Sequence, residues 1–102
     1  MKKYQIALMN NPGWETKVHL ITTDLQLFEE FLAEIKKSFP KSRISIHGDY
    51  PSGQGYACYV EQLSGKDWQV SLWLLNHLCN NGWEPFAVEE RNYHFRRMSD
   101  QN

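Results

Sequence analysis

The sequence predicts an α+β domain in which two helices pack on one face of an antiparallel or mixed sheet, in the order ββα-ββα-ββ. Three observations support this class. Several short segments alternate polar and apolar residues, as half-buried strands do. Two longer segments repeat apolar residues at helical spacing, and turn-forming residues separate all of these segments. Helices separated by hairpins favour such a sheet, with the helices on one side.

The first hairpin is predicted from residues 4–9 and 14–21, with four turn-forming residues, Asn10-Asn11-Pro12-Gly13, between them. A helix should follow, because Thr23 and Gln26 have the spacing of a capping box, with the Thr23 hydroxyl at the N-cap. Pro40 should end this helix. Its apolar face is predicted to comprise Leu25, Phe28, Phe31, Leu32, Ile35 and Phe39.

The second hairpin is predicted from residues 43–47 and 56–62, joined by a loop from Gly48 to Gly55 that contains three glycines. A second helix should run from about Asp67 to Asn80. Its apolar residues cover well over half of the helix circumference: Val70, Leu72, Trp73, Leu74, Leu75, Leu78 and Cys79. A helix apolar over so wide an arc is usually covered on more than one side, which a domain of 102 residues can hardly do alone.

The last hairpin is predicted from residues 83–89 and 93–97. Gly82 suits the left-handed position that ends the preceding helix. Residues 98–102 are expected to form a frayed tail. Because no linker divides the chain, residues 1–97 are predicted to form a single domain.

One stretch of the chain carries a recognisable pattern, formed by Leu75, Asn76, Leu78, Gly82, Trp83 and Glu84, with Phe95-Arg96-Arg97 after it. It resembles a family of small bacterial proteins of unknown function, marked by a helix reading L-N-x-L-G-x-x-G-W-E and a closing strand that ends in basic residues. Cys79 stands where that family commonly has glycine. The resemblance covers about residues 70–97. It implies a small α/β domain, often a stand-alone cytoplasmic protein, and implies no activity.

Charge and cysteine content bound the class of protein. The net charge is near −1, with 11 basic and 12 acidic residues. Binders of nucleic acid or membranes normally carry a clear excess of Lys and Arg, so both are disfavoured as partners. Cys58 and Cys79 are too few for a disulfide-stapled secreted domain. No apolar stretch approaches the roughly 20 residues that span a membrane, so we expect a reduced cytoplasmic protein.

Catalytic and metal-binding patterns are weak. The histidines at positions 19, 47, 77 and 94 have no spacing typical of a metal site. Both cysteines lie inside apolar elements, away from the helix N-termini and basic neighbours that stabilise a thiolate. The sequence therefore predicts no catalytic residues, no metal, no cofactor and no enzymatic activity.

The favoured hypothesis is a non-enzymatic interaction or regulatory protein that self-associates or binds another protein. The wide apolar arc of the second helix and the four tryptophans motivate it. Its candidate interface residues are Trp68, Leu72, Trp73, Leu75, Cys79 and Trp83. RNA binding is less favoured.

The alternative is a regulator that binds a small anionic ligand or nucleotide. His47 and His94 both stand on the polar phase of predicted strands, so neighbouring strands would bring them together. With two arginines they could hold a phosphate or carboxylate. The candidate ligand-binding residues are Arg43, His47, Asp49, Tyr50, His94 and Arg96.

Overall fold

The computed structural model describes residues 2–10, 17–47, 55–61 and 67–100. The elements, in chain order, are β1 (Lys2–Asn10), β2 (Lys17–Thr22), α1 (Leu25–Ser38), β3 (Arg43–His47), β4 (Tyr56–Glu61), α2 (Asp67–Asn80), β5 (Glu84–Glu89) and β6 (Asn92–Asp100). The predicted α+β class, with an antiparallel sheet, is confirmed.

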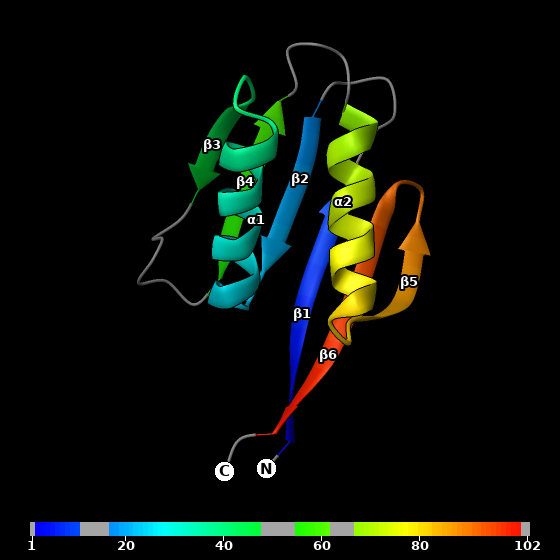
Figure 1. Cartoon of the computed structure of the whole chain (residues 1–102). Coiled ribbons are helices and arrows are strands. Elements are labelled where there is room, and N and C mark those ends of the chain that lie inside the picture. The colour runs from blue at the N-terminus through cyan, green and yellow to red at the C-terminus, as the bar shows by residue number, and fades with distance from the viewer. Residues whose placement is uncertain (1, 11–16, 48–54, 62–66, 101–102) are drawn as a thin grey trace.

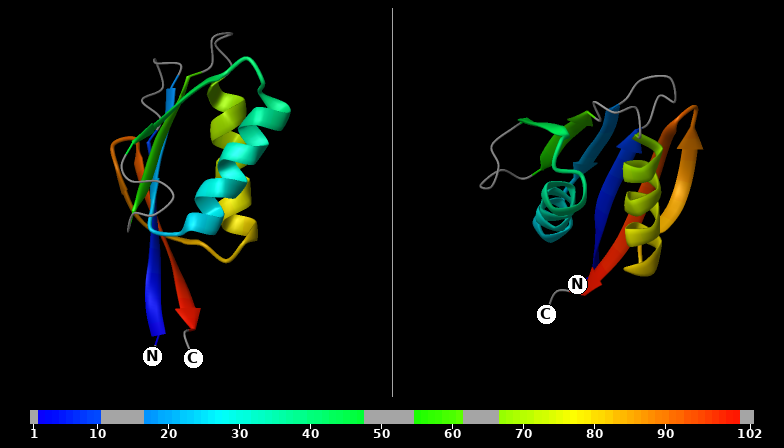
Figure 2. Two further views of the ribbon diagram at one scale, coloured as in Figure 1. Left: turned by 90° about the vertical axis from the view of Figure 1, so that its left-hand side faces the viewer. Right: turned by 45° about the horizontal axis from the view of Figure 1, so that its top comes forward.

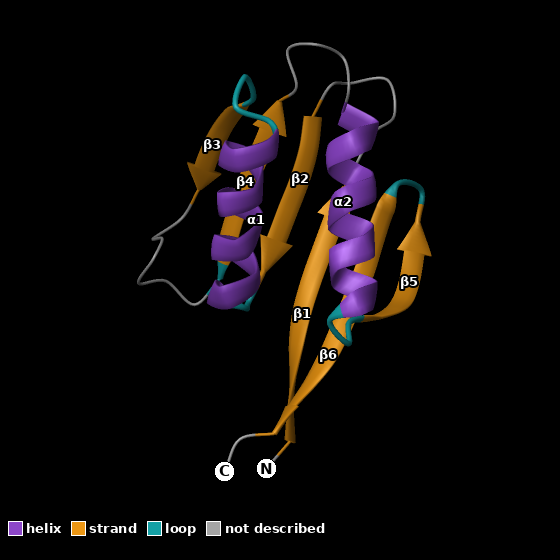
Figure 3. Ribbon diagram, in the orientation of Figure 1, coloured by secondary structure: helices purple, strands orange, loops and turns teal. Residues whose placement is uncertain are grey.

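The strands form a single six-stranded sheet in the order β3-β4-β2-β1-β6-β5. Every pair of neighbours is antiparallel. The β1–β2 hairpin therefore lies at the centre, and each of the other hairpins joins it through its second strand. Both helices lie side by side on the same face of the sheet (Figures 1 and 2). The fold has two layers, one of helices and one of strands (Figure 3). The described residues place no helix on the opposite face of the sheet (Figure 2, left).

The core fills the space between the helices and the covered face. Alternation along the strands directs every second side chain towards the helices, as Val18 and Leu20 on β2 show. From the helices, Phe28, Phe31, Leu74 and others close the layer. Leu27 is also buried, although the predicted apolar face of α1 did not include it.

The start of α1 differs from the prediction. The N-cap is Asp24, whose side chain accepts a hydrogen bond from the backbone N–H of Gln26. The Thr23 hydroxyl instead accepts a hydrogen bond from the backbone N–H of Ile6, at 3.1 Å. A capping-box pattern cannot reveal this competing hydrogen bond, because Ile6 is on β1, far from Thr23 in sequence.

The end of α2 follows the prediction. Gly82 has φ +81°, a left-handed conformation that glycine adopts without strain. The backbone N–H of Trp83 then bonds to the carbonyl of Leu78 at 3.0 Å, which satisfies one of the free carbonyls at a helix end. Trp83 itself is buried.

The C-terminal strand is longer than the sequence indicates. Residues 98–102 were predicted to fray, but Met98, Ser99 and Asp100 continue β6 and pair with Tyr4, Lys3 and Lys2 of β1. The reason is that β1 starts early and offers a partner along its whole length. Residues 101–102 lie outside the described part of the chain.

Candidate functional site

Most of the large apolar side chains that are exposed in the described part of the chain lie on the uncovered face of the sheet. Nine large apolar side chains are exposed among the described residues. By strand register, six of them project from the uncovered face: Tyr4, Ile6, Ile21, Tyr59, Phe86 and Met98. Exposed apolar patches of this kind commonly mark interaction sites, so this face is the first place to look for function.

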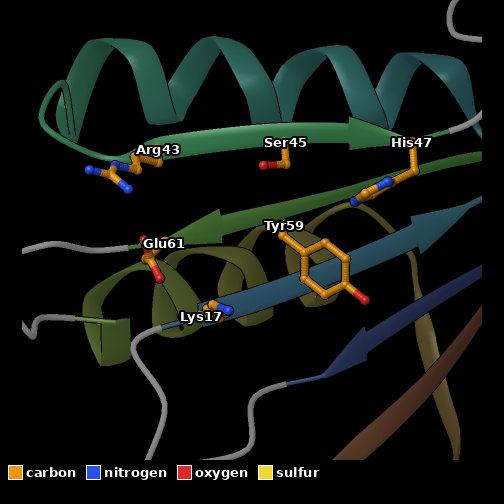
Figure 4. Close-up of a pocket in the computed structure, with 6 residues that line it drawn as sticks. All are labelled: Lys17, Arg43, Ser45, His47, Tyr59 and Glu61. Carbon is orange, nitrogen blue, oxygen red and sulfur yellow. The ribbon is translucent and has the colours of Figure 1, made fainter.

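One half of this face, over β3, β4 and β2, forms a depression of about 360 Å³. Figure 4 shows its lining, which comes from three adjacent strands: Lys17, Arg43, Ser45, His47, Tyr59 and Glu61. Register explains the grouping. Arg43, Glu61 and Lys17 stand in one row across the strands, and Ser45 and Tyr59 stand in the next. We call this region the Tyr59 depression.

Aromatic contacts fix the centre of the depression. The imidazole of His19 stacks on the ring of Tyr59, with centroids 3.9 Å apart and planes 18° from parallel. The imidazole of His47 makes a T-shaped contact with the same ring, with centroids 5.1 Å apart and planes at 87°. Figure 4 shows the Tyr59 ring face-on among the other lining residues. Because Tyr59 remains 39% exposed, this ring offers a flat surface on which a second planar group could stack.

Charge in the depression is mixed but has an excess of cations. Lys17 and Arg43 bring two fixed positive charges, and Glu61, in the row between them, brings one negative charge. Burial lowers the pKa of His19 below 6.5, and the neighbouring His47 lowers it further. The His19 imidazole beside Tyr59 is therefore mostly neutral at pH 7, and the positive charge available to an anion comes from Lys17 and Arg43.

The other half of the face, over β1, β6 and β5, is a patch of rings and aliphatic groups around Arg96. The guanidinium of Arg96 lies over the rings of Tyr4 and Phe86, at 5.3 Å and 5.4 Å from their centroids. It also lies 3.6 Å from the Glu84 carboxylate. We define the apolar patch as Tyr4, Ile6, Phe86 and Met98, with Arg96 at its centre.

The predicted ligand-binding residues do not form one site. Arg43 and His47 line the Tyr59 depression. His94 and Arg96 are on the same face, but β4, β2 and β1 separate their strand from β3. His47 and His94 stand in one cross-strand row, four strand spacings or roughly 19 Å apart. Asp49 and Tyr50 lie outside the described residues.

The depression contains residues that the sequence reading missed, among them Lys17, Ser45, Tyr59 and Glu61. Alternation along the predicted strands does place each of them on the polar phase. The sequence did not show which strands are neighbours, and strand order decides which outward-facing side chains lie next to one another.

The candidate interface residues on and after α2 also divide. Trp73 is partly buried, with its ring between Phe31 of α1 and His77, whose Nε2 lies 3.1 Å from Glu30. Trp83 is buried under the guanidinium of Arg97. These two tryptophans, Trp73 and Trp83, therefore make contacts within the chain. Leu72 and Cys79 remain exposed, Leu75 is partly buried, and the side chain of Trp68 lies outside the described residues.

Neither cysteine takes part in a disulfide, Cys58 being buried and Cys79 exposed. Burial is the main cause that raises the pKa of the Cys58 thiol to about 12, which keeps it protonated and weakly nucleophilic at neutral pH. Among the described residues, no three His, Cys, Asp or Glu side chains gather as a metal site would need. In the same part of the chain, no helix has the length and apolar character required to cross a membrane.

Comparison with known proteins adds no family to this description. No family model matches the chain, and no curated protein and no solved structure matches it either. The resemblance of residues 70–97 to a family of small bacterial proteins therefore stays a prediction.

Proposed function

We propose that the chain is a non-enzymatic interaction protein that self-associates through the apolar patch on the uncovered face of its sheet. The observation that carries the proposal is the exposure of that patch. Tyr4 is 55% exposed, Met98 49% and Phe86 46%, and they surround a single arginine. A second copy would remove these side chains from water, which is the main source of association free energy.

The composition of the patch suits a protein partner. Aromatic residues, methionine and arginine are enriched in the centres of protein–protein interfaces, whereas lysine and glutamate are depleted. Arg96 already has Glu84 as a partner at 3.6 Å, so a second copy would meet little uncompensated charge. Two sheets that pack face to face, about 10 Å apart, are a common way to bury such surfaces.

Light scattering across a concentration series tests this proposal. We expect the wild-type chain to show a mass above that of one chain, increasing with concentration. Phe86→Lys places a charge in the patch and should weaken association at least tenfold. The matched control is Val88→Lys, because Val88 lies on the same strand, is 61% exposed and projects to the other face. A wild-type chain that stays monomeric at every concentration would overturn the proposal.

A second candidate surface for self-association lies on α2. Leu72 and Cys79 are exposed on α2, and Leu75 is partly buried between them on the same side of the helix. In the same experiment, Leu72→Lys distinguishes the two surfaces. If Leu72→Lys weakens association and Phe86→Lys does not, the interface lies on α2 and not on the sheet.

A further inference from the structure

We propose that the Tyr59 depression is a binding site for a small molecule that combines a planar ring with an anionic group, such as a mononucleotide or an aromatic carboxylate. This goes beyond self-association, because the depression lies over β3, β4 and β2, on the other half of the uncovered face from the apolar patch. The two halves of the face differ in their side chains, so the proposal of ligand binding and the proposal of self-association can each be wrong independently of the other.

The ring requirement follows from Tyr59. His19 stacks on the phenol ring at 3.9 Å, and His47 makes a T-shaped contact with it at 5.1 Å. The ring is therefore held in place before a ligand arrives, which reduces the entropy lost on binding. A planar group stacked on the exposed side of Tyr59 would extend the pair of stacked rings to three.

The anion requirement follows from the row of charges next to that ring. Arg43 and Lys17 stand on either side of Glu61 and together exceed it by one positive charge. An arginine can hold a phosphate or carboxylate through two parallel hydrogen bonds. Arg43 is on β3, the edge strand of the sheet, and no described strand pairs with the outer side of β3.

Size and polarity also match this class of ligand. A volume of about 360 Å³ lies at the low end of the range for small-molecule sites. Besides the cations and the ring, the lining contains the Ser45 hydroxyl and the Glu61 carboxylate. Glu61 can accept a hydrogen bond from an amino or hydroxyl group of the ligand, so a ligand that carries a donor beside its anionic group is favoured over a bare anion.

Isothermal titration calorimetry with adenosine 5′-monophosphate tests the proposal. Adenosine supplies the ring without the charge, and ribose 5-phosphate supplies the charge without the ring. We expect the complete nucleotide to bind at least tenfold more tightly than either half. A parallel titration with 4-hydroxybenzoate asks whether a carboxylate can replace the phosphate. Both titrations should use a protein concentration at which light scattering shows one constant mass, so that self-association does not contribute heat.

Variants then place the binding in the depression. Tyr59→Leu removes the ring and should weaken nucleotide binding roughly tenfold, since one stacked base is worth about that much. Arg43→Gln removes one fixed charge and should have a similar effect. Its control is Lys37→Gln, which removes one positive charge from the exposed surface of α1.

Three results would overturn the proposal. The first is that neither the nucleotide nor 4-hydroxybenzoate binds. The second is that the nucleotide binds no better than ribose 5-phosphate, which would indicate a simple anion site. The third is that Tyr59→Leu, with an unchanged melting temperature, binds as the wild type does. Binding in the Phe86→Lys variant should equal that of the wild type, so failure of self-association and failure of this site give different results.

Discussion

The two faces of the sheet are built from the same six strands but differ in how far their side chains are buried. The covered face presents side chains such as Val18, Leu20 and Phe95, almost completely removed from water. The uncovered face presents exposed rings, arginines and histidines from the alternate positions of the same strands. The comparison shows that neighbouring residues of a central strand such as β2 lie in different environments, one buried under the helices and the next facing water. Neighbouring residues should therefore respond very differently to substitution.

The largest effect is expected for Phe95, which is 2% exposed on the covered side of β6. Phe95→Ala should lower the free energy of unfolding by about 3–5 kcal/mol, the usual cost of truncating a buried phenylalanine. Phe86→Ala, on the uncovered face and 46% exposed, should cost less than about 1 kcal/mol. Urea unfolding measures both. Equal costs for the two variants would show that the uncovered face is part of the core.

An intermediate effect is expected for Arg97, which projects to the covered side. Its guanidinium lies 2.8 Å from the carboxylate of Asp24, donates to the carbonyl of Asn81 and covers the ring of Trp83. Arg97→Ala leaves the Asp24 carboxylate without its cation. We expect a loss of about 2–3 kcal/mol, less than for a fully buried pair, because Arg97 is partly exposed.

Its neighbour Arg96 is the matched control, because it projects to the uncovered face and pairs with Glu84 over 3.6 Å. Arg96→Ala should cost less than about 1 kcal/mol in urea unfolding, as exposed ion pairs and cation–π contacts usually do. If Arg96→Ala destabilised the chain as much as Arg97→Ala, the apolar patch would have to be counted as a structural cluster.

The smallest effect concerns pH and His19 on the uncovered face. The folded chain holds the pKa of His19 below the value of 6.5 that it has when unfolded, mainly through burial. The unfolded chain therefore binds the proton more readily. The contribution of His19 to stability is fully present above pH 6.5 and is lost as the pH falls through 6.5 towards the folded pKa. His19→Phe keeps a ring against Tyr59 and removes this titration.

Urea unfolding of wild type and His19→Phe at pH 8 and at pH 5.5 measures that contribution. The two proteins should lose different amounts of stability between these pH values, with the larger loss in the wild type. An identical loss in both would assign the pH dependence to other groups.

Local patterns predicted much of this fold, and long-range contacts account for what they missed. The apolar spacing of α1 was sufficient to predict that helix, and Gly82 was sufficient to predict the end of α2, because both features depend on residues close in sequence. The N-cap was misassigned because Thr23 bonds to Ile6, seventeen positions away. The prediction that His47 and His94 share one site was wrong for the same reason. The order of strands in a sheet depends on which strands pair, and alternation along a single strand does not show that.

The contacts of the candidate interface residues also depend on long-range packing. Trp73 and Trp83 were predicted at an interface from the wide apolar arc of the second helix and from the four tryptophans. Within the chain, Trp73 contacts Phe31 and Trp83 lies under Arg97, and both of these residues come from other elements. The Tyr59 depression was missed although every one of its described residues could be assigned to the polar phase of a strand, because only the register shows which of them meet.

The pairing of β1 with β6 also has a consequence for the order in which the molecule assembles. Lys2 pairs with Asp100, so this contact closes a loop of nearly the whole chain, and such closures cost more chain entropy than the local hairpins do. The β5–β6 hairpin should therefore dock late during refolding and open early in the native state. Amide hydrogens of β6 would then exchange sooner than those of β2, and an opened molecule would lose the apolar patch while the strands that carry the Tyr59 depression remain paired.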